Sequence, residues 1–586
     1  MNEQTAPKGI IKQTYRKGGR ILAEMLKAHG VGPMFGMGGF QLLPFYEAVR
    51  ELGLEHNLIN DERTGAYAAD AYARLSGRPG VCDATLGPGA TNLITALVES
   101  LNAGVPLVAI VGDANRDHAW KNMTQEARQV EILRPAVKEL IRVEKAERIP
   151  ELVRRAFSVA TSGRPGPVVL DIPEDIAHGD ADVPFEEIYA DEITTSIPAV
   201  RCRADERDIA DAAALLSGAK RPIILAGGGV HLSQAYDALA QFAEAFLIPV
   251  AHTMSGKGAV ACNHPMSLGI FGRYSRIAND MLAASDCILS IGCKLGEIAT
   301  RRYGLLPKDV PIIHMDILPE EFRRTSRTKI TLWSDARAGI RDLHAAMSKA
   351  AAKQQKLRSG LADEIAGRMK AWREEARQRT HSDETPINVA RIVETMNNVL
   401  PADAVLVADG GFAAHWTGLF YDTKQAGRGY MPDRGLAAIG YGLPGAIGAW
   451  TAAKGRPVVS ITGDGGFNMS LGDLETARRM RADFIICIVN NAASGYVKAL
   501  QHATYGQGAY QSSDLMETNY AEIAKAFGCY GIRVESPADL TGAFKKALAE
   551  KGRPTIIDIV ATRDPAAMLP GTDARALKMK PGDRPV

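Results

Sequence analysis

Three polar residues at set positions carry the clearest chemical signal in this sequence. Asp464 lies at the end of an apolar run, PVVSITGDG (457–465), and Asn490 and Asn491 end the next one, FIICIVNN (484–491). The 27-residue interval from Asp464 to Asn491 is long enough for one right-handed strand–helix–strand crossover. Such a crossover places both side chains at the carboxyl ends of neighbouring parallel strands, where ligands bind in open α/β sheets.

The donor types at these positions suit a hard cation beside a phosphate. Mg²⁺ takes few protein ligands, prefers oxygen and completes its octahedron with water and phosphate oxygens. Asp464 offers a carboxylate and Asn491 an amide oxygen, while Gly463 and Gly465 allow a diphosphate to approach the backbone closely. Taken singly, the aspartate fits a surface turn and the asparagine a helix cap. The pair at this spacing, between two apolar strands, favours a magnesium–diphosphate site.

Short β-branched runs alternate with helical patterns along the chain, which is typical of parallel α/β domains. We therefore expect an α/β protein with three doubly wound parallel-sheet domains. The predicted divisions are an N-terminal domain 1–180, a linker 181–205, a Rossmann-like central domain 206–345, a linker helix 346–385, a C-terminal domain 386–565 and a tail 566–586. The GGG segment at 227–229 lacks the GxGxxG pattern, so a phosphate-facing turn and a plain tight turn are equally good interpretations.

The composition excludes several classes of protein. With 46% hydrophobic and 23% charged residues, the chain is typical of globular proteins, and 69 basic against 67 acidic residues indicate neither nucleic acid nor a membrane surface as partner. No apolar run approaches the roughly 20 residues of a membrane span, and the N-terminal segment lacks the apolar core of a signal peptide. The seven cysteines are scattered without a CxxC pair. We expect a reduced, cytoplasmic protein without disulfides or a zinc site.

These segments resemble the thiamine-diphosphate enzymes of the acetolactate synthase, pyruvate oxidase and benzoylformate decarboxylase group, most closely acetolactate synthase large subunits. Their diphosphate motif is GDG followed by NN one crossover later, as in 463–491 here. The resemblance covers nearly the whole chain and includes ERTGAYAADAYARLSGRPGV (62–81), LGPGATNLITAL (86–97), SGRPGPVVLDIPEDI (162–176) and RGLAAIGYGLPGAIGA (434–449). It implies three α/β domains: one for the cofactor's pyrimidine ring, one central, and one for its diphosphate.

The resemblance also implies roles for individual residues. Asp464 and Asn491 would be side-chain ligands of Mg²⁺, with the backbone carbonyl of Ala493 as a third ligand. Glu62, which alone reads as a helix-capping carboxylate, would hydrogen-bond the aminopyrimidine ring and promote proton loss from the thiazolium carbon. Ile439, which alone reads as a core residue, would hold the cofactor in its bent shape. The other expected cofactor contacts are Pro88, Asn92 and Gln125 on the pyrimidine side, and Gly411, Phe412, Gly465, Gly466, Gly495 and Tyr496 on the diphosphate side.

Two positions depart from acetolactate synthases and leave the substrate open. Phe40 ends FGMGGF (35–40) where those enzymes read FGYPGG, and Leu500 stands where they carry a tryptophan. Phe40 is expected to close part of the substrate space. His118 is the first candidate for acid–base work because it shares a loop with Gln125, although a solvent-facing role is the commoner one for such a residue. The further candidates, with the same alternative, are Lys121, His415, Lys498 and His502.

The resemblance favours decarboxylation of a 2-oxo acid followed by carboligation. The alternative is a lyase or decarboxylase acting on a 2-hydroxyacyl-CoA, an oxalyl-CoA or an aryl 2-oxo acid. A non-catalytic scaffold is disfavoured because Glu62, Asp464 and Asn491 are all present. In this family the pyrimidine domain of one subunit faces the diphosphate domain of another. We therefore expect a homodimer or a dimer of dimers with shared active sites, whose central domain binds FAD, ADP or nothing.

Overall fold

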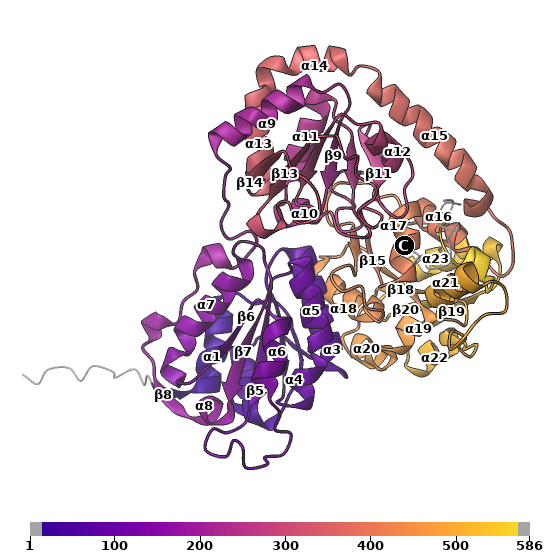
Figure 1. Ribbon diagram of the computed structural model, residues 1–586. Coiled ribbons are helices and arrows are strands. Elements are labelled where there is room, and N and C mark those ends of the chain that lie inside the picture. The colour runs from indigo at the N-terminus through magenta and orange to yellow at the C-terminus, as the bar shows by residue number, and fades with distance from the viewer. Residues whose placement is uncertain (1–14, 572–586) are drawn as a thin grey trace, which may run out of the picture.

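The computed structural model, which describes residues 15–571, contains three six-stranded sheets with helices on both faces (Figure 1). Every strand pairing within these three sheets is parallel. Because both faces of each sheet are covered, the central strands are largely apolar, as in IICIVN, which is buried throughout. The three-sheet α/β fold expected from the alternating pattern is confirmed.

The N-terminal unit has the strand order β3-β2-β4-β5-β7-β6. Its strands are β2 (Met34–Met37), β3 (His56–Leu58), β4 (Gly80–Ala84), β5 (Leu107–Asp113), β6 (Glu139–Arg142) and β7 (Pro167–Pro173). Its helices are α1 (Gly18–Ala28), α2 (Leu43–Leu52), α3 (Glu62–Ser76), α4 (Pro88–Asn92), α5 (Ile94–Ala103), α6 (Gln129–Leu133), α7 (Ile149–Thr161) and α8 (Glu174–His178). A two-stranded antiparallel ribbon joins β1 (Tyr15–Lys17) to β8 (Asp180–Asp182) at the start of the predicted linker.

The central unit has the strand order β11-β10-β9-β12-β13-β14, so the strand order reverses beside β9. Its strands are β9 (Pro222–Ala226), β10 (Val250–His252), β11 (Ser267–Ile270), β12 (Cys287–Ile291), β13 (Ile312–Asp316) and β14 (Ile330–Trp333). Its helices are α9 (Glu206–Gly218), α10 (Gly229–Leu232), α11 (Tyr236–Phe246), α12 (Ala278–Ala283) and α13 (Ala336–Met347). The carboxyl ends of β9 and β12 border the crevice that such a reversal creates.

The C-terminal unit has the strand order β16-β15-β17-β18-β20-β19, with its reversal between β15 and β17. Its strands are β15 (Val405–Ala408), β16 (Tyr430–Pro432), β17 (Val458–Gly463), β18 (Ile485–Asn490), β19 (Tyr530–Val534) and β20 (Thr555–Val560). Its helices are α16 (Val389–Val399), α17 (Phe412–Phe420), α18 (Gly442–Ala452), α19 (Asp464–Asn468), α20 (Leu474–Arg479), α21 (Gly495–Tyr505), α22 (Tyr520–Ala526) and α23 (Leu540–Ala549).

The long charged helix expected over 346–385 is broken into two helices, α14 (Ala351–Leu357) and α15 (Leu361–Thr380). The break occurs at Arg358, whose buried guanidinium donates to carbonyls at the ends of α9 and α11, including Phe246 O at 2.6 Å. Carbonyls at helix ends lack the regular intrahelical partner, and the arginine gives these ones a donor at the point where the chain turns. Helix α15 then crosses from the central to the C-terminal unit (Figure 1).

Helices α3 and α18 pack against each other and join the N- and C-terminal units (Figure 1). Glycine makes this approach possible, since a Cβ on Gly448 would collide with the backbone of Ala68. At the end of the described chain, Met568 is buried and its carbonyl accepts a hydrogen bond from Trp416 Nε1 at 3.0 Å. The rest of the predicted tail, 572–586, lies outside the described residues. Among residues 15–571, no helix combines the length and apolarity that crossing a membrane requires.

Candidate functional site

Asp464 and Asn491 lie at the carboxyl edge of the C-terminal sheet. Strands β17 and β18 pair in parallel with Gly463 opposite Val489, so Asp464 and Asn491 follow the ends of adjacent strands. Asp464 is 2% exposed and begins α19, and Asn491 is 4% exposed. The crossover predicted from the 27-residue spacing therefore forms, although the predicted helix between the strands is short and begins with a 3-10 turn, Leu471–Asp473.

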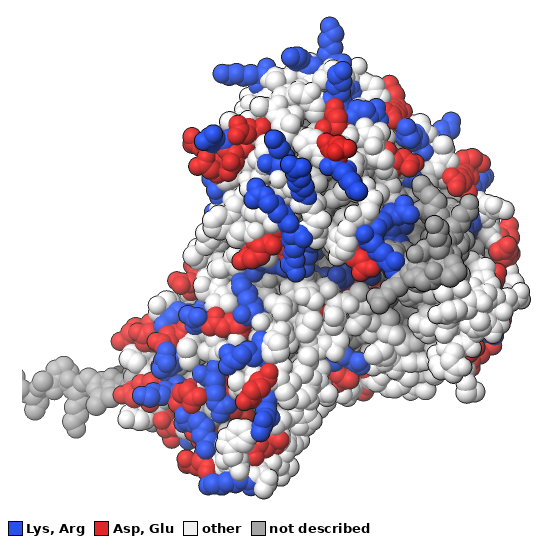
Figure 2. Space-filling view, in the orientation of Figure 1, with Lys and Arg blue, Asp and Glu red and all other residues white. Residues whose placement is uncertain are grey.

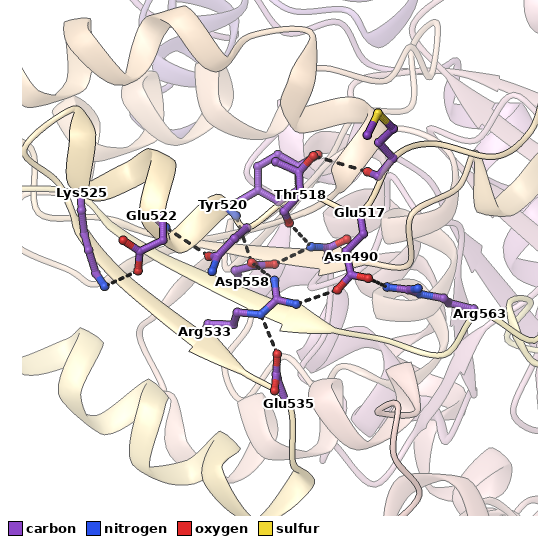
Figure 3. Close-up of polar contacts among 12 residues, drawn as sticks. Asn490, Glu517, Thr518, Tyr520, Glu522, Lys525, Arg533, Glu535, Asp558 and Arg563 are labelled. Atoms are coloured by element: carbon purple, nitrogen blue, oxygen red, sulfur yellow. Dashed lines mark hydrogen bonds and ion pairs between the residues drawn. The ribbon is translucent and has the colours of Figure 1, made fainter.

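The two asparagines at the end of the 484–491 run have different environments. Asn490 Nδ2 donates to Asp558 Oδ1 and to the Thr518 carbonyl, each at 2.8 Å, and Arg533 pairs with the same aspartate (Figure 3). The side-chain amide of Asn490 thus fixes β18 to its neighbours. Asn491 makes no hydrogen bond through its side-chain amide within residues 15–571, and a Cβ on Gly495 would come within 2.6 Å of its Nδ2. Asn490 Oδ1 is buried without a partner in the described chain, but its Nδ2 is held, so Asn491 is the one of the pair whose whole side-chain amide is free to turn towards a ligand.

The Asp464 carboxylate is only partly satisfied. Its Oδ1 accepts the Gly465 N–H at 2.8 Å, but Oδ2 is buried without a hydrogen-bond partner in the described chain. Burial raises the pKa of Asp464 to about 6, against the opposing effect of nearby backbone N–H groups. A buried, unpaired carboxylate oxygen is costly, and a divalent cation beside it would both satisfy it and favour its ionised form. Asp464 and Asn491 therefore fit Mg²⁺.

The backbone around this pair is held in place on both sides. Ala493 forms a bridge with Asp514, and the Leu515 N–H donates to the Ala492 carbonyl at 2.8 Å. Gly465 and Gly466 follow Asp464 in the first turn of α19, and a Cβ on Gly466 would collide with Asp409. These residues leave a glycine-lined helix start beside Asp464, which is a favourable place for a phosphate.

The loop that carries Ile439 is fixed by two carboxylates that were not among the predicted site residues. Asp409, at the end of β15, accepts the N–H groups of Gly440 at 3.0 Å and Tyr441 at 2.9 Å through Oδ1. Glu99, from the N-terminal unit, accepts the Gly435 N–H at 2.7 Å and those of the two residues after it. Ile439 itself is half exposed, in contact range of the positive-φ turn at Gly411 that precedes Phe412. It is not a core residue of the single chain.

Glu62 belongs to a second cluster in the N-terminal unit. It is 6% exposed at the first turn of α3, behind the N-cap Asp61, and its Oε2 accepts a hydrogen bond from Asn92 Nδ2 at 2.9 Å. Helix α4, which begins at Pro88, supplies Asn92, and a Cβ on Gly89 would lie 3.1 Å from Glu62 Oε1. No hydrogen bond between residues 15–571 joins this cluster to Asp464 or Asn491.

Gln129 positions the start of α4. The sequence predicted Gln125, and not Gln129, as a residue of this site. Gln125 and His118 are exposed on the loop between β5 and α6, although the Gln125 backbone packs on Gly87. The buried Gln129 accepts the Gly87 N–H at 3.0 Å and donates to Asp171 Oδ1 at 2.7 Å. Gln129 begins a short helix and belongs to no recognisable motif, so the sequence does not indicate its role.

The remaining candidates lie apart from the two clusters or have structural partners. Phe40 is exposed and stacks on His178, with ring centroids 5.3 Å apart, and Leu500 is partly exposed. Lys498 pairs with Asp514, and His502 lies 2.9 Å from the Tyr510 hydroxyl. Lys121 donates to the Asp117 carbonyl at 2.7 Å, and His415 is buried between Tyr274 and Tyr496. The Tyr496 hydroxyl accepts from Arg273 at 2.5 Å.

Asp171 makes the pyrimidine-side cluster sensitive to pH. Burial, followed by the charge of Asp113, raises the pKa of Asp171 to about 7. Since an unfolded aspartate has a pKa near about 3.9, folding favours the protonated form, and that stabilisation is lost as pH rises towards 7. We expect Asp171→Asn, which stays neutral and still accepts from Gln129, to gain stability over wild type by up to about 1.4 kcal/mol per pH unit across this interval.

Unfolding midpoints of both proteins, measured between about pH 5 and pH 8, test this expectation. Asp180→Asn is the control because Asp180 is exposed and pairs with Lys17 at the surface. A difference between Asp171→Asn and wild type that does not change with pH would contradict the assigned protonation.

A cavity of about 320 Å³ lies where the three units meet. It is bordered by the GGG turn, Gly227–Gly229, and by Gly292 at the reversal between β9 and β12. A Cβ on Gly229 would come within 2.6 Å of the Gly292 Cα, so these glycines are needed for close packing of the two strand ends. The plain tight turn is therefore present, and because the turn also lines the cavity, the phosphate-facing interpretation stays a prediction. Further lining residues include Arg164, Arg273, Lys294, Asp316, Asp335 and Arg434.

Family models of thiamine pyrophosphate enzymes match the chain in three blocks: the N-terminal TPP binding domain at 16–132, the central domain at 209–343 and the C-terminal TPP binding domain at 409–559. A probable acetolactate synthase large subunit of Methanocaldococcus jannaschii is 33% identical, over 94% of this chain and 93% of its own length. The acetolactate synthase isozyme 2 large subunit of Escherichia coli K12 is 30% identical, over 91% of this chain and 94% of its own length. The acetolactate synthase large subunit of Lactococcus lactis is 28% identical, over 93% of this chain and 92% of its own length. Matched over almost its entire length, with Glu62, Asp464 and Asn491 inside the matched blocks, the chain belongs to the thiamine pyrophosphate enzymes.

Proposed function

We propose that the chain decarboxylates a 2-oxo acid and joins the remaining fragment to a second carbonyl compound, with thiamine pyrophosphate and Mg²⁺ as cofactors. The observation that supports this most directly is the buried, unpartnered Asp464 Oδ2 beside Asn491 at the carboxyl edge of the sheet. When bound, thiamine pyrophosphate supplies the carbon nucleophile and the electron sink for cleavage of a bond next to a carbonyl. The protein supplies orientation, charge and exclusion of water.

Each cluster has its own task in this proposal. Asp464, Asn491 and the Ala493 carbonyl would hold the metal, and Gly465, Gly466 and Gly495 let the diphosphate approach the backbone. Glu62, kept in place by Asn92, would hold a proton at the pyrimidine ring nitrogen. Ile439 would support the cofactor from below, since Asp409 and Glu99 fix the loop that carries it.

We also propose that two copies of the chain complete the site. Side chains that a monomer would leave in water surround the metal cluster: Leu436, Ile439, Met469, Val497, Leu515 and Met516 are all exposed. Figure 2 shows a largely uncharged area over this part of the C-terminal unit. Phe40 and Trp120 are among the exposed apolar side chains of the N-terminal unit. An apolar area of this kind around a cluster of ligand residues is typical of a subunit interface.

The central cavity supports binding of a flavin nucleotide. It lies at a topological reversal, where nucleotides bind in doubly wound sheets, and Asp316 lines it as an acceptor for hydroxyl groups of a nucleotide. We propose FAD as the occupant. A visible absorption spectrum of the purified protein tests this, because bound flavin absorbs there and an empty or ADP-loaded cavity does not.

A substrate panel tests the proposed reaction. Purified protein loaded with thiamine pyrophosphate and Mg²⁺ is offered short and aryl 2-oxo acids, a 2-hydroxyacyl-CoA and oxalyl-CoA, and CO₂ release and ligation products are measured. We expect CO₂ release from a 2-oxo acid together with a ligated hydroxy-ketone product. Turnover of the CoA thioesters alone would show that the chain is a lyase of the alternative class.

A further inference from the structure

A lysine amine and a cysteine thiol lie side by side in the loop that joins β10 to β11. Lys257 is 1% exposed and Cys262 is 6% exposed. Lys257 Nζ lies 3.8 Å from Cys262 Sγ. Neither residue lines the central cavity, and neither belongs to the two clusters assigned to the cofactor. The proposed reaction therefore makes no use of this pair of nucleophiles.

The charge of the Lys257 amine has no counter-ion in the described chain. Among residues 15–571, no carboxylate lies within ion-pairing distance of Nζ, which donates to the Gly418 carbonyl at 3.1 Å. Asp422, in the next loop of the C-terminal unit, is held by Arg276 at 2.6 Å and by Arg373 at 3.0 Å. Burial lowers the pKa of Lys257. The uncharged amine that burial favours has a free electron pair and can attack an electrophile.

The thiol of Cys262 is held against the C-terminal unit. Its Sγ lies 3.3 Å from the hydroxyl of the buried Thr423, and the Cys262 N–H donates to the Thr423 carbonyl at 2.8 Å. Of the cysteines in residues 15–571, all of which are free thiols, Cys262 is the one with a lysine amine in hydrogen-bonding contact. Both partners of a covalent bond are thus fixed next to each other, which favours their reaction over that of separated groups.

We propose that Lys257 and Cys262 form a covalent modification site, at which hydrogen peroxide joins Nζ to Sγ and a thiol reductant releases them. In the first step the Cys262 thiol reduces one peroxide to water and becomes a sulfenic acid. In the second, the Lys257 amine attacks the sulfur. The sulfur–oxygen bond breaks, and the oxygen leaves as water with its own hydrogen and one from the amine. The Thr423 hydroxyl is placed to hydrogen-bond this oxygen.

The sulfur–nitrogen bond would also change a contact between two units of the fold. It draws Nζ towards Sγ and away from the Gly418 carbonyl, near the end of α17. Two equivalents of a thiol reductant reverse the reaction: they restore the thiol and the amine and leave as a disulfide. The inference does not depend on the proposed carboligation, because neither step involves the cofactor.

Tryptic mapping of the whole protein tests the proposal, since trypsin cleaves after a lysine only when its amine is free. The folded protein is treated with hydrogen peroxide or left untreated, its remaining thiols are blocked, and it is then unfolded and digested. The chain has no other lysine or arginine between Arg221 and Arg273 that trypsin could use. We expect peroxide to leave residues 221–273 as one fragment, lighter by two hydrogens, and dithiothreitol added before blocking to restore cleavage after Lys257.

Two variants and an unfolded sample complete the experiment. Cys262→Ser should be cleaved after Lys257 with or without peroxide, whereas Cys202→Ser, which removes a partly buried thiol outside this loop, should still give the joined fragment. Wild type that is unfolded before peroxide treatment should be cleaved, because the two groups are then no longer held together. Cleavage after Lys257 in the treated folded protein, with oxygen added to Cys262, would overturn the proposal. So would a fragment 221–273 that also survives in Cys262→Ser.

Discussion

Glu62→Gln should reduce turnover by at least about 10²-fold, the low end for loss of a positioned proton-transfer group, while cofactor affinity changes little. The substitution keeps the size of the side chain and its contact with Asn92, but glutamine cannot take up or release a proton at the pyrimidine ring. Turnover and cofactor affinity are measured on the same preparation, so loss of chemistry is separated from loss of binding.

Glu55→Gln provides the matched control, because Glu55 is exposed a few residues earlier in the same unit. Its turnover should equal that of wild type. Full activity of Glu62→Gln would show that the buried glutamate caps α3 and has no part in the reaction.

Asp464→Asn should weaken Mg²⁺-dependent binding of thiamine pyrophosphate by at least about 10²-fold. Loss of a residue that only supports a metal ligand already lowers metal affinity about 10- to 100-fold, and loss of a ligand itself should cost at least as much. The same change should not destabilise the cofactor-free protein. Burial raises the pKa of Asp464 to about 6, so the stability of wild type falls as pH rises through 6, and asparagine carries no such penalty.

Calorimetric titration and unfolding midpoints at about pH 8 together check this expectation. Asp403→Asn, an exposed position of the same unit, should behave as wild type in both. A variant that loses binding because it is unfolded would show a lowered midpoint, and would contradict the assignment of Asp464 as a ligand residue.

The two variants also test whether the site is shared between subunits. If Glu62 of one copy serves the metal of another, a dimer of one Glu62→Gln and one Asp464→Asn chain has one intact site. Random mixing would then restore about a quarter of wild-type activity, since half of the dimers are mixed and each has one working site. Mixtures that stay inactive after subunit exchange, as shown by a tag on one variant, would place the whole site within one chain.

Much of the fold could be predicted because its central strands carry strong local patterns. The apolar runs at 457–465 and 484–491 became β17 and β18, since strands buried on both faces must be largely apolar. Short strands such as β3, β10 and β16 carry too few residues to stand out. The break at Arg358 depends on carbonyls more than a hundred residues away in the chain, so no local pattern could indicate it.

The candidate site also contains some residues that the sequence indicates and others that it does not. Asp464, Asn491 and Glu62 stood out because each lies beside a strand end with glycine or a helix start nearby, which is a local feature. Asn490 looked equivalent to Asn491, and only its contacts with Asp558 and Thr518 separate the two. Gln129 and Glu99 act by accepting backbone N–H groups that folding brings to them. Such residues have no signature in the sequence.

A calorimetric titration of the wild-type protein with thiamine pyrophosphate, with and without Mg²⁺, tests the central claim most directly. We predict saturable binding that requires Mg²⁺, is retained in Glu62→Gln and is lost in Asp464→Asn. Absence of binding by wild type in excess Mg²⁺, or equal affinity in its presence and absence, would contradict the assignment of Asp464 and Asn491 as the metal–diphosphate site.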